Sequence, residues 1–258
     1  MDEVSPAASH ALSRPARIVV VTGAARGIGR CIASHFSAAG DVVIVTDIDA
    51  AGAGACAHAI GCAAPSIPMD VRDAAQVNEV LGRIDAEQGG VDVLINNAGL
   101  MTKGPFAETS REEFDAMWAV NVIGIFNAVQ AVAPIMIRRR QGVIVNIASV
   151  SSVRGGGSVG NVWYGASKAA VVAMTSGLAR ELGAHGVRVN AISPGVIETD
   201  MVRKFMTPQL REKVLTRFPL ARLASVDDVA RMAVFLASAE AGFVTGQTIA
   251  VDGGFLTT

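Results

Sequence analysis

The sequence predicts an α/β fold in which one parallel, doubly wound sheet of seven strands carries helices on both faces. Short β-branched runs alternate with helical stretches, which is the pattern of right-handed crossovers between parallel strands. The apolar runs of the predicted strands are nearly continuous rather than alternating, as expected for strands buried on both faces. A length of 258 residues without a linker or a shift in composition favours a single domain.

The predicted elements follow this alternation in order. Each strand is a β-branched run, and a helical stretch follows the turn after it. The predicted strands are Arg17–Thr22, Asp41–Asp47, Ser66–Val71, Val91–Asn96, Val143–Ala148, Val187–Ile192 and Thr248–Val251. The predicted helices are Gly27–Ala39, Ala50–Ile60, Asp73–Gln88, Ser110–Arg139, Tyr164–Ala184 and Val226–Ala237.

Two segments lie outside the alternation. Residues 1–15 contain acids and two prolines but no apolar core of a signal peptide, so we expect a flexible N-terminal tail before a domain over residues 16–258. Residues 198–223 mix Met and Phe with charged residues in a helical excursion that is long for a connection after a strand. We predict an active-site lid there, with an ordinary pair of surface helices as the alternative.

The composition excludes several classes of function. A net charge of −1 and a pI of about 6.4 leave no basic field that would hold a nucleic acid or an anionic membrane. No apolar run approaches the roughly 20 residues of a membrane span. The three cysteines lack CxxC spacing and indicate reduced thiols in a cytoplasmic protein. The four histidines show no metal-ligand spacing, so no metal site is expected.

A glycine-rich turn follows the first predicted strand and begins the first predicted helix. Residues Thr22–Gly29 read TGAARGIG. Glycines at this spacing let the backbone approach a pyrophosphate closely, and the helix N-terminus adds unpaired N–H groups and a positive dipole end. The turn therefore predicts a dinucleotide phosphate site, with simple turn chemistry as the alternative. The residues expected to contact the cofactor here are Gly23, Arg26, Gly27, Ile28 and Gly29.

An acidic residue ends the second predicted strand. Asp47 follows Gly29 by 18 residues, about the distance at which an acid reaches the adenosine ribose hydroxyls. Its charge would repel a 2′-phosphate, so Asp47 favours NAD over NADP. Arg26 favours the opposite choice, because its guanidinium could pair with that phosphate. We expect Asp47 to decide, since it lies at the ribose whereas a cation in the loop can face solvent.

The segment Tyr164–Lys168 carries the predicted chemistry. At positions i and i+4 of a helix, the two side chains lie on one face with Cβ atoms about 5–6 Å apart. A phenol with a pKa of about 10 is a poor base at neutral pH. One ammonium at about 4 Å supplies roughly 4 kcal/mol at an effective dielectric of 20, enough to lower that pKa by about three units. The pattern is weak by itself, because Lys168 could equally be a solvated surface charge.

Taken together, these motifs resemble the short-chain dehydrogenase/reductase family from Arg17 to the C-terminus. The resemblance includes the glycine turn, NNAG over residues 96–99, a Ser before YxxxK, and VDGG over residues 251–254. It implies a Rossmann-type fold, Tyr164 as general acid/base, and Lys168 as the group that lowers its pKa and holds the nicotinamide ribose. It implies further that Asn121 holds a water of a proton relay, although a satisfied core amide remains an alternative for that residue.

The resemblance also implies the other contacts of the site. Ser149 would hydrogen-bond the substrate oxygen. The family usually places its serine 13 residues before the tyrosine; Ser151 has that spacing, whereas Ser149 is 15 residues before Tyr164. We favour Ser149 because it directly follows a predicted strand, and Ser151 stays open. The remaining cofactor contacts implied by the resemblance are Asp70, Val71, Asn97, Gly99, Tyr164, Lys168, Pro194, Gly195, Ile197 and Thr199.

These observations predict an oxidoreductase that transfers a hydride between NAD(H) and a secondary alcohol or ketone, a small-molecule substrate. The first alternative is a 3-oxoacyl-[acyl-carrier-protein] reductase, an NADPH-dependent branch with the same motifs, and the second is a non-catalytic dinucleotide-binding protein. The resemblance implies a homotetramer. The helix Tyr164–Ala184 supports this, because it is apolar on more than one face.

Overall fold

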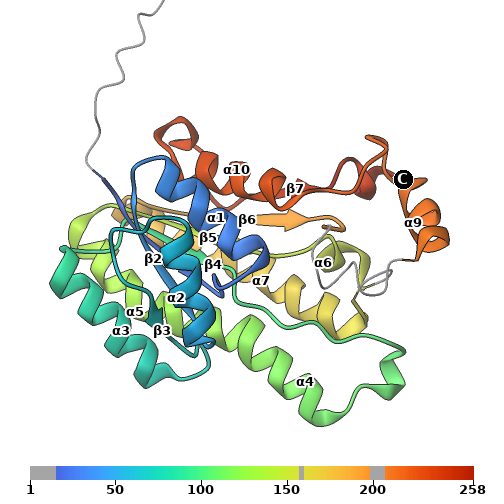
Figure 1. The fold of residues 1–258 in the computed structure, drawn as a ribbon, viewed down its shortest axis with the longest axis horizontal. Helices are drawn as coiled ribbons and strands as arrows, with labels where there is room; N and C mark the ends of the chain where they lie inside the picture. Colours follow the sequence, from blue (N-terminus) through green and yellow to red (C-terminus); the bar gives the residue numbers. More distant parts are fainter. Residues whose placement is uncertain (1–15, 157–159, 198–206) are drawn as a thin grey trace, which may run out of the picture.

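The computed structural model describes residues 16–156, 160–197 and 207–258. At its centre lies one seven-stranded sheet in the order β3-β2-β1-β4-β5-β6-β7, in which each strand runs parallel to its neighbours (Figure 1). This confirms the predicted fold class. The strands are β1 (Ile18–Thr22), β2 (Val42–Asp47), β3 (Ile67–Pro68), β4 (Val93–Asn96), β5 (Gly142–Ile147), β6 (Val187–Pro194) and β7 (Thr248–Val251).

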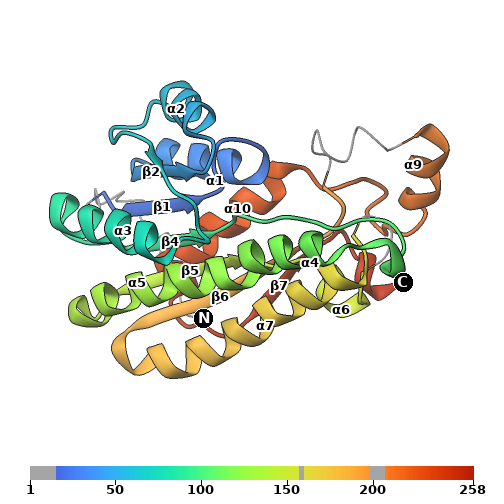
Figure 2. The ribbon, with the colours of Figure 1, turned by 90° about the horizontal axis from the view of Figure 1, so that it is seen from below.

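Helices cover both faces of this sheet (Figure 2). On one face, α1 (Gly27–Ala38), α2 (Ala50–Ala59) and α10 (Val226–Ala237) share a core with the sheet that includes Phe36. On the other face, α3 (Ala74–Gln88), α5 (Gly124–Arg139) and α7 (Val162–Leu182) form a second core. The shorter helices are α4 (Arg111–Trp118), α6 (Ser151–Arg154) and α9 (Pro208–Leu215).

Several element boundaries differ from prediction. The strand predicted over Ser66–Val71 is only Ile67–Pro68, because it is an edge strand and proline has no N–H to extend the ladder. The helix predicted over Ser110–Arg139 is divided by a π-helical segment, Ala119–Ile123. The short helix α6 was not predicted, whereas α9 lies within the helical excursion predicted over residues 198–223. The predicted tail and residues 198–206 of the predicted lid lie outside the described residues.

The helical run from Arg111 to Arg139 corrects the expectation that no apolar run approaches the length of a membrane span. It is long and apolar enough to cross a membrane by length and composition alone. The sequence did not show one continuous apolar run here, because polar residues such as Asn121 and Asn127 interrupt the apolar residues. Half of the most apolar window is buried inside the fold, and core helices pass the same test of length and composition. Residues Ile125, Val129 and others of α5 belong to the second core.

The strand order creates the place where a ligand is expected. The chain moves outward from β1 to β3 and then returns to β4 on the other side of β1. At such a switch point, the loops after the two central strands diverge and leave a crevice at their carboxyl ends. The glycine turn follows β1, and Asn97 follows β4, so both lie at this crevice.

Candidate active site

The glycine turn is held in place by the residues that follow β4. The Thr22 hydroxyl accepts hydrogen bonds from the backbone N–H groups of Asn97 (3.0 Å) and Ala98 (3.1 Å). The Asn97 side-chain amide donates to the carbonyls of Thr22 and Gly23, each at 2.9 Å. Gly23 has a φ of +62°, and a Cβ there would lie 2.7 Å from the Ala98 backbone. The turn is thus shaped before any ligand binds, and only glycine fits at its closest approach.

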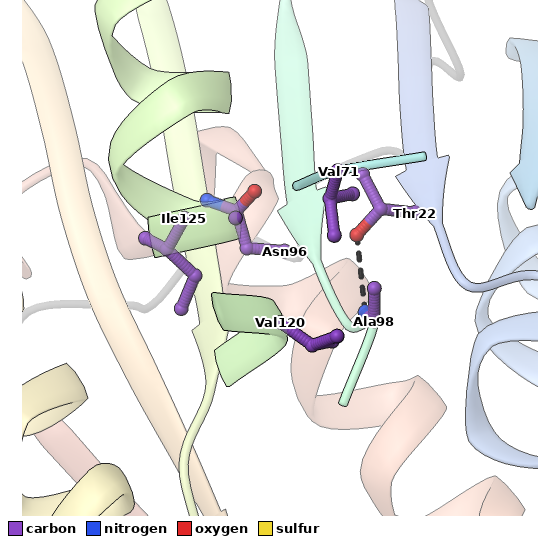
Figure 3. A pocket seen from close by; sticks show the side chains of 7 residues that line it. Thr22, Val71, Asn96, Ala98, Val120 and Ile125 are labelled. Atoms are coloured by element: carbon purple, nitrogen blue, oxygen red, sulfur yellow. Dashed lines mark hydrogen bonds between the residues drawn. The ribbon is translucent and has the colours of Figure 1, made fainter. Parts of the chain in front are cut away.

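Figure 3 shows the inner wall of this crevice, with the Thr22–Ala98 hydrogen bond between β1 and the loop after β4. Val71, Asn96, Val120 and Ile125 complete the wall. The hollow that they line has no room for a water molecule. It is therefore packed structure behind the ligand crevice.

Asp47 is fixed beside the glycine turn. One carboxylate oxygen accepts from the Ala25 N–H (3.0 Å) and the other accepts from the Asp49 N–H (3.0 Å). Arg26, the N-cap residue of α1, is exposed and makes no capping hydrogen bond with its side chain. The fixed charge at the end of β2 is thus negative, whereas the nearby cation extends into solvent.

Asp70 and Val71 follow the edge strand β3. The Asp70 carboxylate pairs with Arg72 at 2.6 Å, and this pairing lowers the pKa of Asp70 below its ordinary value. Its predicted adenine contact must therefore share the carboxylate with Arg72. The Val71 side chain packs on Gly124, where a Cβ would approach it within 2.7 Å.

Tyr164 lies against Ser149 at the first turn of α7. The Ser149 hydroxyl forms a side-chain hydrogen bond with the Tyr164 phenol and accepts from the Ser151 N–H at 3.1 Å. Ser151 instead belongs to α6, and its carbonyl accepts from Gly155 at 2.9 Å. The geometry therefore favours Ser149 over Ser151 as the hydroxyl that acts beside the phenol.

Lys168 is buried beneath the tyrosine. It is 4% exposed, its Nζ donates to the Ile147 carbonyl at 2.7 Å, and this nitrogen lies 5.9 Å from the Tyr164 ring centre. Burial lowers the pKa of Lys168 to about 8. Burial also raises the pKa of Tyr164, and the Ser149 hydrogen bond offsets this only in part. Desolvation is thus the largest influence on the phenol of the chain on its own, and the role of Lys168 in lowering the tyrosine pKa stays a prediction.

Asn121 lies in the π-helical segment, fully buried. Its Oδ1 accepts from the Leu100 N–H (2.8 Å), and its Nδ2 donates to the Leu100 carbonyl and the Ser167 hydroxyl, each at 2.9 Å. Ser167 donates to the Tyr164 carbonyl at 2.8 Å. The alternative of a satisfied core amide describes this side chain well. The water-holding role stays a prediction.

The last predicted contacts follow β6. Pro194 ends the strand, and its carbonyl accepts from the Val150 N–H at 3.0 Å, which ties it to the loop carrying Ser149. Gly195 approaches Asp252 so closely that a Cβ would lie 3.0 Å from the aspartate backbone. Ile197 is buried and bridges to Ala224. Thr199 lies outside the described residues.

A dinucleotide would fit these residues at two cradles. The bare glycine turn leaves the α1 N-terminus open to a pyrophosphate. Gly99 leaves space in front of the buried lysine, because a Cβ there would lie 3.6 Å from the Lys168 Nζ and 3.4 Å from the Asn121 Oδ1. The ammonium donates one hydrogen bond to Ile147, and its other hydrogens are available to ribose hydroxyls at this space.

Comparison with known proteins agrees with this geometry. A family model described as enoyl-(acyl carrier protein) reductase matches residues 23–256. The chain is 39% identical over 243 residues to the 3-oxoacyl-[acyl-carrier-protein] reductase FabG of Thermotoga maritima, covering 93% of this chain and 98% of that one. The chain belongs to the short-chain dehydrogenase/reductase family. As a member, the chain is an oxidoreductase that acts on CH–OH groups and binds a nicotinamide cofactor.

Two further relatives carry other names. Galactitol 2-dehydrogenase of Agrobacterium fabrum is 39% identical over 249 residues, covering 92% of this dehydrogenase and 96% of that chain. The crystal structure of a gluconate 5-dehydrogenase from Burkholderia cenocepacia, in complex with NADP and tartrate, superposes with a TM-score of 0.88 at 34% identity, covering 94% and 96% of the two chains. Family members of similar likeness thus carry different substrate names.

Sequence reasoning missed Asn161, which organises the start of α7, the helix that carries Tyr164 and Lys168. It is the N-cap of α7, and its Oδ1 accepts from the Trp163 and Tyr164 N–H groups (3.1 and 3.2 Å). Its Oδ1 also accepts from the Thr102 hydroxyl (2.6 Å), and its Nδ2 donates to the Thr109 hydroxyl (2.8 Å). An Asn three residues before the tyrosine is a helix-start signal. It escaped notice because the helix was predicted to begin at Tyr164.

Proposed function

We propose that this dehydrogenase interconverts a secondary alcohol and a ketone with NAD(H) as the preferred cofactor. The observation that carries the preference is the Asp47 carboxylate, which two backbone N–H groups hold beside the glycine turn. A fixed carboxylate can accept charge-assisted hydrogen bonds from two ribose hydroxyls, worth about 1.5–3 kcal/mol each. The same carboxylate repels a 2′-phosphate, and the exposed Arg26 recovers only about 1 kcal/mol at most.

The residues of this chain would divide the chemistry among them. When bound, the nicotinamide supplies or accepts the hydride. Tyr164 donates a proton to the carbonyl oxygen or takes one from the alcohol, and Ser149 donates a hydrogen bond to the same oxygen. Lys168 holds ribose hydroxyls with its free hydrogens. Its ammonium favours the phenolate, and a positively charged nicotinamide would add to that effect.

A second candidate is a 3-oxoacyl-[acyl-carrier-protein] reductase that uses NADPH. The FabG relatives support this alternative better than the main proposal, since those of several bacteria are 38–39% identical to the chain. The NADP in the gluconate 5-dehydrogenase structure supports the phosphorylated cofactor as well. The protonated Tyr164 of the chain on its own also suits reduction, in which the phenol is the proton donor.

The decisive experiment crosses two cofactors with two substrate classes. We would measure kcat/KM for NAD(H) and NADP(H) with a panel of polyols and secondary alcohols, and with a 3-oxoacyl thioester. The proposal expects NAD to exceed NADP by about a hundredfold, since about 1.4 kcal/mol is tenfold. Asp47→Ser should shrink that ratio, and Ile48→Arg added to it should shrink it further. Preference for NADPH with the thioester would establish the second candidate instead.

A homotetramer with 222 symmetry remains part of the proposal. Ile123 and Phe126 support it, because these large apolar side chains are 42% and 52% exposed where the π-helical segment joins α5. Sedimentation should give a mass near four times 26.6 kDa at micromolar protein. A mass near one chain would reject the tetramer without affecting the proposed chemistry.

A further inference from the structure

Outside the active site, three metal-ligating side chains converge where α1 meets α10. Cys31 and His35 lie four residues apart on α1 and therefore on one face of that helix. Asp227 lies in the first turn of α10. Its Oδ1 lies 3.6 Å from the Cys31 Sγ and 2.9 Å from the His35 Nε2. All three ligand atoms lie within 4.8 Å of one another.

We propose that Cys31, His35 and Asp227 bind a divalent transition-metal ion of the zinc class, which joins α1 to α10. Zinc takes S, N and O ligands at about 2.0–2.3 Å in a tetrahedron, which separates ligand atoms by about 3.3–3.8 Å. The separation between Cys31 and Asp227, 3.6 Å, lies in that range, whereas that between His35 and Asp227, 2.9 Å, is shorter and the third pair lies within 4.8 Å. Small side-chain rotations would therefore be needed to close the site. Thiolate and carboxylate together balance the charge of a divalent ion.

The surroundings leave one coordination position for water. The Asp227 side chain is 51% exposed and the His35 side chain 27% exposed, so the cluster opens to solvent on one side. On its other side the cluster is backed by α1 and α10, which pack in a common core. Arg231 is the opposing charge, since its electrostatic influence reaches Cys31. Because the site is partly exposed, solvent screens that repulsion.

The Cys31 thiol lies beside the Asp227 carboxylate, with 3.6 Å between the Sγ and the Oδ1. On binding, the metal replaces the thiol proton, which leaves to solvent. This site was not predicted from the sequence, because Asp227 is 192 residues from His35 along the chain.

The test is a calorimetric titration of Zn²⁺ into the untagged, chelator-treated full chain. We expect one ion per chain with micromolar or tighter affinity. Cys31→Ser and His35→Gln should each weaken binding at least tenfold, and Asp227→Asn should weaken it as well. The matched controls are Cys62→Ser and His58→Gln, a half-buried thiol and an exposed imidazole near or in α2, which should leave the affinity unchanged.

A second readout identifies the ligand atoms. Co²⁺ in place of Zn²⁺ should give a sulfur-to-metal charge-transfer absorption in the unmodified chain and in the Cys62→Ser chain, but none in the Cys31→Ser chain. Zinc should also raise the Tm of the unmodified chain and not that of His35→Gln. The proposal is overturned if the unmodified chain binds no zinc, or if the Cys31→Ser and His35→Gln chains bind it as tightly.

Discussion

The cofactor side and the chemical side of the active site differ in how their polar groups are satisfied. On the cofactor side, Thr22 and Asn97 use their hydrogen bonds to shape the glycine turn. On the chemical side, Lys168 is buried against a carbonyl with its pKa lowered to about 8. Among the described residues, the buried hydroxyls without a protein partner, Ser152 and Ser193, also lie on this side.

This difference separates a preformed half from a half that is completed by its ligands. The glycine turn needs no rearrangement to accept a pyrophosphate, because its shape is set by protein contacts. Lys168 and Tyr164 both have pKa values displaced by burial toward their neutral forms. Hydroxyls and charges brought by the ligands would reverse that displacement. Substitutions in the two halves should therefore fail in different ways.

The largest expected effect is that of Tyr164→Phe on turnover. The variant keeps the ring but loses the proton carrier, so kcat should fall by about two to four decades. The dissociation constant of the cofactor, measured by calorimetry, should change little, since no contact of the preformed half is altered. Retention of most turnover would show that another group transfers the proton.

The serine pair gives the next largest effect. Ser149→Ala removes the hydroxyl that bonds Tyr164, and loss of one such donor costs about 10²–10³ in kcat. Ser151→Ala, the matched control two residues away, should change kcat by less than about fivefold, because the hydrogen bond to the phenol comes from Ser149. Steady-state kinetics of both variants would reveal a reversed order if Ser151 were the active hydroxyl.

Replacing the buried Lys168 should raise the free energy of unfolding, because its burial on the chemical side destabilises the fold. The pKa of Lys168 is about 8 in the fold and 10.5 as its ordinary value, so the native state binds fewer protons between those pH values. Stability therefore rises with pH across that window, and the full penalty is present below pH 8. We expect Lys168→Met to gain about 2 kcal/mol at pH 7, after the unpaired Ile147 carbonyl is counted, and to lose that gain near pH 10.5.

The measurement is denaturant unfolding of the unmodified protein and of Lys168→Met at pH 7 and pH 10. The kcat of Lys168→Met is measured alongside and should fall. Arg180→Met is the control, since it removes an exposed charge from the same helix. An equal gain at both pH values would contradict the titration argument. So would a destabilised Lys168→Met chain at pH 7.

Much of this division could be predicted from the sequence, but only where the signal is local. Continuous apolar runs predicted the sheet, and β7 and α10 lie at their predicted bounds. The glycine turn and the Tyr164–Lys168 spacing are likewise local. The direction of the tyrosine pKa was not predictable, because burial depends on contacts between distant segments. The π-helical segment that carries Asn121 has no composition that distinguishes it from an α-helix.

Thr22→Val tests the preformed half. The substitution keeps the shape but removes the acceptor of two buried N–H groups, each of which costs about 1–3 kcal/mol when left unpaired. We expect the glycine turn to loosen, so that KM for NAD and NADP rises about tenfold in parallel while kcat at saturation changes little. A selective loss of kcat would contradict the assignment of Thr22 to the cofactor side.

The smallest expected effect concerns Asn161, which joins the two halves of the comparison. Its amide caps the helix that carries Tyr164 and binds the loop that follows Gly99. Loss of an N-cap costs about 1 kcal/mol, so Asn161→Ala should lower stability by about that amount and shift the first turn of α7. Because the phenol then sits less accurately, kcat should fall about tenfold with the cofactor KM unchanged. Asn161→Asp keeps the capping oxygen and should restore most of kcat, although the Thr109 hydrogen bond is lost. If Asn161→Asp were as slow as Asn161→Ala despite recovered stability, the donor to Thr109, and not the cap, would be the contact that positions the tyrosine.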